Sequence, residues 1–153
     1  MTLQNNYYSI AMTDLLFLQH SLDTEFYNQI TIQCQQVVEK LLKSVLEIVS
    51  PQAQKLFGSH NLRSIATEIA NNGVSLNVSI KDFAVLKDYY FESRYPGADF
   101  LIATRTDCEQ ALITVYDTVD AVNAFRMSKG LSTETFQRIP LTQLNNNNNK
   151  CTT

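Results

Sequence analysis

The sequence predicts an all-α protein, folded as an up-and-down bundle of four or five helices. Apolar residues recur at helical spacing along nearly the whole chain, and the strict alternation that is typical of strands is scarce. The four glycines are scattered between the periodic segments, at helix ends or in loops. With 153 residues, the chain is long enough to form one domain whose core needs neither disulfides nor metal.

The first two predicted helices follow one another closely. The first spans about residues 4–21, and one apolar stripe contains Ala11, Leu15, Leu18 and Leu22. The second begins after a cap at Asp23 or Thr24 and ends near Val49, because Ser50 and Pro51 interrupt it. Its apolar residues form two rows, Ile30, Cys34, Val37, Leu41, Val45 and Ile48 beside Val38, Leu42, Leu46 and Val49. So wide a face predicts a central helix with more than one neighbour.

Three more helices and a tail complete the prediction. A helix of about ten residues begins after a cap at Ser59 or Asn61 and stops at Asn71 to Gly73. The next covers about residues 79–93, with Phe83, Leu86 and Tyr90 on one side. The last begins after a cap at Thr106 or Asp107, reaches Phe125 and buries a row of Cys108, Leu112, Val115, Val119 and Val122. We therefore assign residues 1–128 to the bundle, and residues 129–153, which include the tract Asn145–Asn149, to a polar disordered tail.

Composition and charge exclude several classes of function. The formal net charge is -3, so no broad basic surface for DNA or RNA is expected. Cys34, Cys108 and Cys151 are far apart and odd in number, which fits reduced cytoplasmic thiols better than disulfides or a zinc site. No secretory leader or membrane-spanning segment is recognisable, and no glycine-rich phosphate loop or nucleophile elbow occurs. We expect a cytoplasmic protein with no cofactor, no metal and no membrane contact.

The segment LKDYYFESRYPG, residues 86–97, places Arg94, Tyr95 and Pro96 directly after a predicted helix. Proline cannot continue a helix and biases the preceding residue away from helical geometry. The turn therefore presents a guanidinium and a phenol at a fixed position. A guanidinium in such a turn is suited to bind phosphate or carboxylate through two parallel hydrogen bonds.

Together with two earlier segments, this one carries a family resemblance. QCQQVVEKLLKSVL (residues 33–46), HNLRSIATEI (residues 60–69) and the RYP segment occur in the order shown by the HEPN family, the small helical "higher eukaryotes and prokaryotes nucleotide-binding" domains. The chain resembles bacterial members that contain the RYP triplet, over roughly residues 7–125. The resemblance implies a helical bundle, a homodimer, a nucleotide or RNA ligand, and pairing with a minimal nucleotidyltransferase in a toxin-antitoxin system.

One family feature is missing. Catalytically active HEPN ribonucleases carry an Arg followed, after four to six residues, by a His, but here the positions after Arg94 hold Asp99, Phe100 and Leu101. An aspartate cannot donate a proton at neutral pH unless its pKa is strongly raised. The resemblance therefore implies a non-catalytic module that binds a nucleotide or a protein partner. The alternatives are a metal-independent RNase toxin with an atypical pair, Arg94 and His60, and a purely structural helical interaction domain.

The candidate ligand-binding residues are Arg94, Tyr95, Tyr90 and His60, with Pro96 and Asp99 shaping the loop; no catalytic residue is assigned. Each has a structural alternative. In the structural alternative, Arg94 binds no ligand: it pairs with Asp99 or Glu92, or stacks on Tyr90, and its role is to hold the loop against the bundle. In the structural alternative for His60, its side chain caps backbone groups at the helix start or packs against the neighbouring helix.

Two charged groups on helices have ordinary explanations. Glu39 and Lys43 have the spacing of an ion pair on a solvated helix face, with a subunit interface as the alternative. Asp117 and Asp120 share a face one turn apart, but no third acid or His accompanies them, which disfavours a metal site.

Overall fold

The computed structural model describes residues 3–143, and this part of the chain is all-helical, which confirms the predicted fold class. Its six helices are α1 (Tyr7–Gln19), α2 (Tyr27–Val49), α3 (Gln54–Phe57), α4 (Leu62–Asn71), α5 (Ile80–Glu92) and α6 (Arg105–Ser128). Five of them match predicted segments, and α3 is a single turn that the sequence analysis did not predict. None of these helices is long and apolar enough to cross a membrane.

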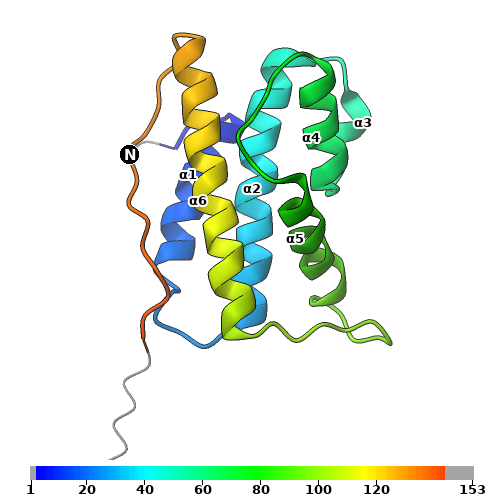
Figure 1. Ribbon diagram of the computed structural model, residues 1–153, viewed down its shortest axis with the longest axis vertical. Helices are drawn as coiled ribbons and strands as arrows, with labels where there is room; N and C mark the ends of the chain where they lie inside the picture. The colour runs from blue at the N-terminus through cyan, green and yellow to red at the C-terminus, as the bar shows by residue number, and fades with distance from the viewer. Residues whose placement is uncertain (1–2, 144–153) are drawn as a thin grey trace, which may run out of the picture.

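The longest helices, α2 and α6, run side by side through the molecule (Figure 1). Helix α1 packs on one side of α2, and α4 and α5 pack on the other. Helix α2 thus contacts α1, α4, α5 and α6, as its wide apolar face predicts.

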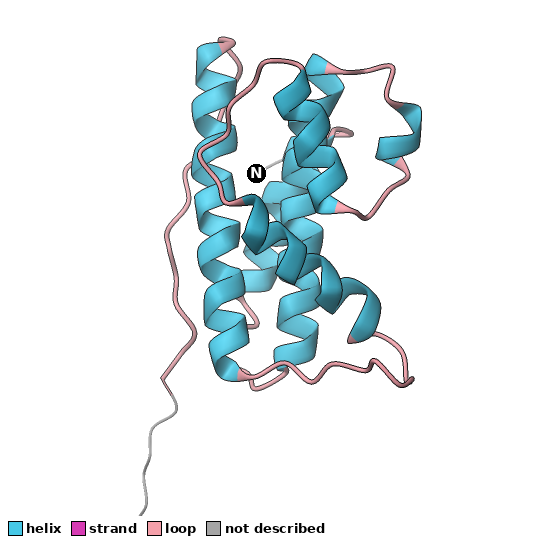
Figure 2. Ribbon diagram, turned by 45° about the vertical axis from the view of Figure 1, so that its right-hand side comes forward, coloured by secondary structure: helices cyan, strands magenta, loops and turns pink. Residues whose placement is uncertain are grey.

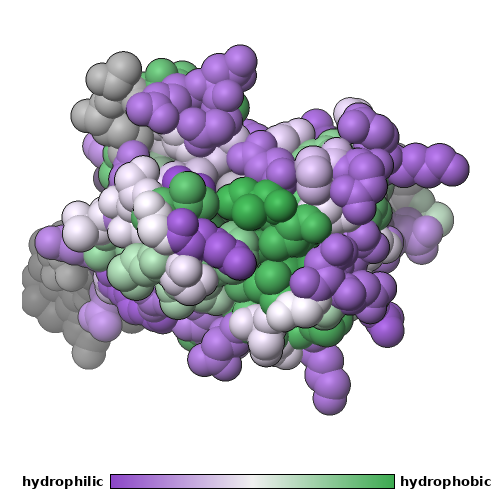
Figure 3. Space-filling model, turned by 90° about the horizontal axis from the view of Figure 1, so that it is seen from above, coloured by the Kyte–Doolittle hydropathy of each residue, from purple (hydrophilic) through white to green (hydrophobic). Residues whose placement is uncertain are grey.

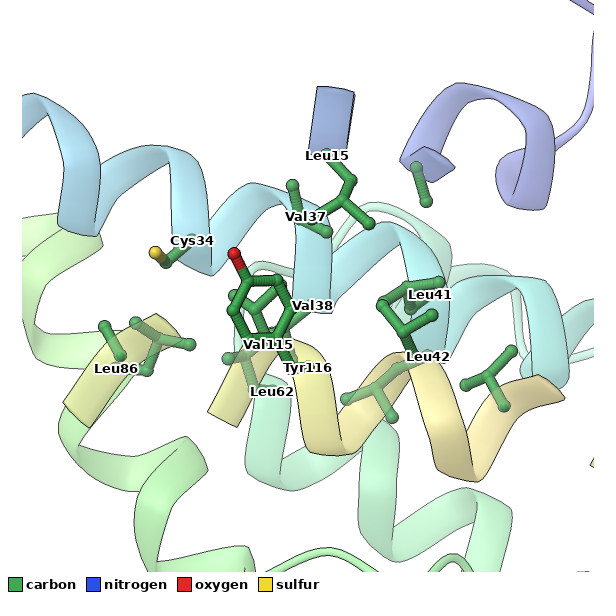
Figure 4. Close-up of a cluster of buried hydrophobic side chains, with 14 of the residues drawn as sticks. Leu15, Cys34, Val37, Val38, Leu41, Leu42, Leu62, Leu86, Val115 and Tyr116 are labelled. Atoms are coloured by element: carbon green, nitrogen blue, oxygen red, sulfur yellow. The ribbon is translucent and has the colours of Figure 1, made fainter. Parts of the chain in front are cut away.

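The predicted core rows are confirmed almost completely. Side chains from α1, α2, α4, α5 and α6 meet around α2 (Figure 4). The predicted stripes of α1 and α6 are buried throughout, and so are both rows of α2 up to Leu46. Ile48 is the exception and is 38 % exposed. Seen from above, the molecule shows a patch of apolar surface among polar side chains (Figure 3).

Helix ends agree with the predicted caps in one case and differ in two. Asn61 caps α4 by accepting a hydrogen bond from Ser64 N, and Gly73 ends it with φ 82°. Helix α6 begins at Arg105 and not after Thr106 or Asp107, because Thr104 and Asp107 form a reciprocal capping box.

The second difference is at the start of α2. Neither Asp23 nor Thr24 caps the helix, which begins at Tyr27 without a side-chain cap. The Thr24 hydroxyl instead donates to Ser21 O at 2.7 Å, so this residue closes the turn after α1.

The chain continues along the bundle after α6 ends at Ser128. Residues 131–142, which we call the strap, run in extended form beside α6 and α1 (Figure 2). Leu141 of the strap is only 3 % exposed. Helix side chains bind the strap backbone, for example Asn123 at Glu134 O and Arg126 at Ser132 O. The predicted Asn tract lies outside the described residues.

Candidate functional site

The turn after α5 is held firmly to the bundle. Helix α5 ends at Glu92, whose carbonyl accepts a hydrogen bond from Leu101 N at 2.8 Å. The Asn28 side chain of α2 donates to Leu101 O at 3.0 Å and accepts from Ala103 N at 2.6 Å. These bonds close the loop of residues 93–104 at its base, so the residues that follow α5 project from a fixed support.

Four of the residues singled out by sequence form one group, which we call the stacked column: His60, Tyr90, Arg94 and Tyr95. The rings of His60 and Tyr90 are stacked, with centroids 4.5 Å apart and planes 27° apart. The Arg94 guanidinium carbon lies 4.6 Å from the Tyr90 centroid and 5.7 Å from the Tyr95 centroid. His60, from the segment before α4, and Tyr90, near the end of α5, are thus brought to one surface.

The column is accessible to a ligand at its Arg94 end. Tyr95 is 67 % exposed, and Arg94 is exposed as well. Within residues 3–143, Arg94 forms no ion pair and donates no hydrogen bond; its contacts are the two aromatic rings. Of the two structural alternatives for Arg94, the structure shows the stacking on Tyr90 and not the pairing with Asp99 or Glu92. A guanidinium held by π faces keeps its donors available for an anion.

A buried charged network lies beneath the column. His60 Nδ1 is 3.0 Å from Glu39 Oε2, and Lys43 Nζ is 2.7 Å from Glu39 Oε1. Gln35 Nε2 donates to Glu39 Oε2 at 2.8 Å. Glu39 and Lys43 are 7 % and 4 % exposed, so the expectation of a solvated helix face is wrong, although the ion pair itself is confirmed.

This network keeps the Glu39 carboxyl group ionised. Burial by itself raises the pKa of the carboxyl group, but hydrogen bonds from Lys43, Gln35 and His60 outweigh burial and leave the pKa below its ordinary value of 4.5. An ionised carboxylate only accepts hydrogen bonds, so His60 Nδ1 must carry its proton. The Nε2 atom of a neutral His60 is then free to accept one.

A pH dependence of stability follows from Glu39. A carboxyl group whose pKa is lower in the folded state stabilises the fold above its unfolded pKa, and this contribution is lost as the pH falls through the folded pKa. We expect the free energy of unfolding of the wild type to fall more steeply below about pH 4.5 than that of Glu39→Gln. Urea unfolding of both proteins from pH 6 to about pH 3 measures the two slopes. Parallel slopes would contradict the assignment.

The other residues singled out by the sequence lie outside the stacked column. Pro96 and Asp99 lie in the loop of residues 93–104 and are exposed. Asp117 and Asp120 both bind Arg138, at 2.9 and 2.5 Å, and no cluster of His, Cys or acidic side chains in the described residues is suited to hold a metal. Cys34 and Cys108 are buried free thiols, and Cys151 lies outside the described residues.

Sequence reasoning missed Gln35, Glu39 and Lys43 as members of the site. Their spacing of four residues, 35, 39 and 43, was visible, and it puts the three polar groups on one face of the helix, beside its apolar rows. This spacing is the same for a buried row and for a solvated one, so it indicates a shared face and not burial.

The geometry provides an exposed cation, an exposed aromatic ring and a histidine oriented by a carboxylate. In comparisons with known proteins, the family model described as HEPN domain matches residues 5–124. No curated protein and no solved structure matches the chain. The matched region contains every residue of the stacked column and the network beneath it.

Proposed function

Because the chain belongs to the HEPN domain family, we propose that it is a non-catalytic module whose stacked column binds the phosphate and base of a nucleotide. The family supports a nucleotide-binding or RNase-related helical module. The observation that carries the proposal is the exposed Arg94 guanidinium, which lies over the rings of Tyr90 and Tyr95 and has no carboxylate partner within the described residues.

Each end of the proposed ligand has a matching group. A phosphate accepts two parallel hydrogen bonds from a planar guanidinium, and Arg94 has the required donors available. A base stacks on an exposed aromatic face, and Tyr95 is 67 % exposed beside Arg94. His60 stacks on the Tyr90 ring and is oriented by Glu39, so it offers the ligand a further polar contact.

The charge of the protein limits the size of this ligand. A long nucleic acid binds mainly through many basic contacts, and the chain has a formal net charge of -3. We therefore expect a mononucleotide or a short single-stranded RNA rather than a duplex.

We further propose a cytoplasmic homodimer that partners a minimal nucleotidyltransferase in a toxin-antitoxin pair. HEPN domains often dimerise, which supports the first part. The two described cysteines are free thiols, which is typical of a reducing compartment. Size-exclusion chromatography with light scattering tests the dimer, and a monomer at all concentrations would contradict it.

Thermal unfolding with a panel of nucleotides and short RNAs tests the binding function. A ligand at one hundred times its dissociation constant adds about 2.7 kcal/mol, which corresponds to roughly 5 to 10 °C for a domain of this size. We expect one member of the panel to produce such a shift in the wild type and a shift at most about half as large in Arg94→Ala, because the variant should bind at least about tenfold more weakly. Lys81→Ala is the matched control, because Lys81 is an exposed cation at the opposite end of α5. No shift of the wild type with any member would contradict the proposal.

One observation favours a second candidate, a metal-independent ribonuclease. The carboxylate-oriented His60 and the cationic Arg94 both contact Tyr90, and such a pair can move a proton and stabilise a developing phosphorane. This function predicts growth inhibition on expression, relieved by either Arg94→Ala or His60→Ala. Unimpaired growth at high expression would exclude the toxin and leave the binding module.

A further inference from the structure

His60 turns one ring nitrogen toward the bundle and the other toward solvent. Its Nδ1 atom lies 3.0 Å from Glu39 Oε2, and Glu39 is only 7 % exposed. The His60 side chain as a whole is 44 % exposed. Because Nδ1 faces the buried network, the exposed edge of the ring is the one that carries Nε2. Nε2 is thus the nitrogen of His60 that a ligand can reach.

The partners of Glu39 determine the tautomer of His60. Lys43 Nζ and Gln35 Nε2 donate to the Glu39 carboxylate at 2.7 and 2.8 Å, and both of these nitrogens are donors only. The carboxylate that they hold in place accepts from His60 Nδ1, so this nitrogen carries the proton of the neutral ring. Nε2 then has a lone pair and no proton. The exposed edge of His60 is therefore a hydrogen-bond acceptor.

His60 and Arg94 are close enough for one nucleotide to bridge them. The His60 ring centroid and the Arg94 guanidinium carbon lie 4.5 and 4.6 Å from the Tyr90 centroid, so they are at most about 9 Å apart. This span matches the distance from the phosphate of a nucleotide to the outer edge of its base. A second base can stack on the exposed ring of Tyr95, 5.7 Å from the Arg94 guanidinium carbon. The stacked column thus fits a dinucleotide step whose phosphate lies at Arg94.

We propose that His60 selects the base at its end of the column, and that this base carries an exocyclic amino group, as adenine and cytosine do. The inference rests on the proposed function and names the class of ligand within it. The amino groups at N6 of adenine and N4 of cytosine donate hydrogen bonds, whereas guanine and uracil carry carbonyl oxygens at the matching positions. A carbonyl oxygen opposite Nε2 would bring two lone pairs together. Proteins read the edges of unpaired RNA bases through hydrogen bonds of this kind.

Glu39 is the positioning residue for this acceptor, and the substitution Glu39→Gln reverses its polarity. Lys43 can only donate, so the single side-chain oxygen of the variant turns to Lys43 and its NH₂ group turns to His60. Gln35 Oε1 is buried and has no hydrogen-bond partner in the described residues, so this amide can turn over and accept from the same NH₂ group. His60 Nδ1 then accepts, and Nε2 carries the proton. The exposed edge of His60 changes from an acceptor to a donor.

Titration calorimetry of the full chain with two dinucleotides tests the selection. One is ApA, and the other is the same dinucleotide built from purine riboside, which lacks the amino group but keeps the ring system, the ribose and the phosphate. The same base at both positions makes the result independent of the direction in which the ligand lies. At pH 8, well above the unperturbed pKa of histidine, we expect the wild type to bind ApA about 3- to 10-fold more tightly.

Three variants locate the preference. His60→Ala removes the acceptor, and Glu39→Gln turns it into a donor, so we expect each of these proteins to bind the two dinucleotides with equal affinity. His20→Gln is the matched control. His20 is also exposed, but its Nδ1 lies 2.7 Å from Leu16 O at the end of α1, and this variant should keep the preference of the wild type.

Nitrogen-15 NMR of the histidine rings measures the tautomer without a ligand. The chain has two histidines, so the spectrum of His20→Gln assigns the remaining ring to His60. At pH 8 we expect an unprotonated Nε2 in the wild type and a protonated Nε2 in Glu39→Gln. A protonated Nε2 in the neutral ring of the wild type would overturn the inference. If circular dichroism shows that Glu39→Gln is unfolded, the wild-type spectrum and the affinities of His60→Ala decide.

The two titrations separate the failure of this inference from the failure of the proposed function. Equal affinity of the wild type for ApA and its purine riboside analogue would overturn the selection by His60. The proposed function would still stand if Arg94→Ala lowered both affinities by the same factor. If the wild type bound neither dinucleotide, both the selection and the proposed function would be wrong.

Discussion

Replacing Glu39 with alanine is expected to lower the free energy of unfolding by about 3 to 5 kcal/mol. The substitution leaves Lys43 as a buried charge, 4 % exposed, without its partner at 2.7 Å. It also removes the acceptor for His60 and Gln35. Urea unfolding monitored by circular dichroism measures the loss.

The neighbouring ion pair is the control for this result. Lys40 pairs with Asp14, and both side chains are more than a quarter exposed. A partly exposed pair of this kind contributes about 0 to 1 kcal/mol, so Lys40→Ala should change stability by no more than that. Similar losses for Glu39→Ala and Lys40→Ala would contradict the burial of the network.

Phe83→Ala is expected to destabilise the fold by about 3 to 5 kcal/mol. Phe83 is 0 % exposed and, with Leu86, is one of only two buried residues assigned to α5. Its ring therefore fixes the helix that carries Tyr90 and leads to Arg94. We expect hydrogen exchange to show loss of protection along α5 before the rest of the bundle.

Val85→Ala is the matched variant on the same helix. Val85 is 57 % exposed, so removing its two methyl groups should change the free energy of unfolding by less than about 0.5 kcal/mol. A loss from Phe83→Ala as small as that from Val85→Ala would show that α5 is held by other contacts.

The helical bundle was predictable because its core follows local periodicity. The row from Cys108 to Val122 repeats at helical spacing, and every member is buried in α6. The cap of α6 was less predictable, since Thr104, Thr106 and Asp107 are all suitable capping residues. The reciprocal bonds between Thr104 and Asp107 decide among them.

The buried network could not be predicted from spacing alone. Glu39 and Lys43 have the same separation as a solvated pair, and their burial depends on elements distant in sequence. His60 comes from the segment before α4, and Tyr90, stacked on it, comes from α5. The packing of these segments against α2 is a tertiary effect that has no local signature.

The contacts of the strap with the bundle could not be predicted from the sequence for a different reason. Its sequence is polar and aperiodic, which is typical of a disordered tail. Its order depends on backbone groups that bind helix side chains such as Tyr8 and Tyr116, and backbone groups leave no trace in a sequence pattern. Only Phe136 and Leu141 mark it as a segment that packs.

The candidate site was partly predictable. Pro96 fixes where α5 stops, and this singled out Arg94 and Tyr95. The structure brings His60 and Tyr90 to the same surface. Their role in ligand binding stays a prediction until a ligand is measured.

The most direct test is a binding cycle between Arg94 and the phosphate of the ligand. Titration calorimetry compares a nucleoside monophosphate with its nucleoside, on the wild type and on Arg94→Ala. A hydrogen bond to a charged group contributes about 1.5 to 3 kcal/mol. Arg94→Ala should therefore lower the affinity for the monophosphate by roughly 10- to 100-fold and leave the affinity for the nucleoside nearly unchanged. An equal loss of affinity for both ligands, or no loss for either, would contradict a phosphate site at Arg94.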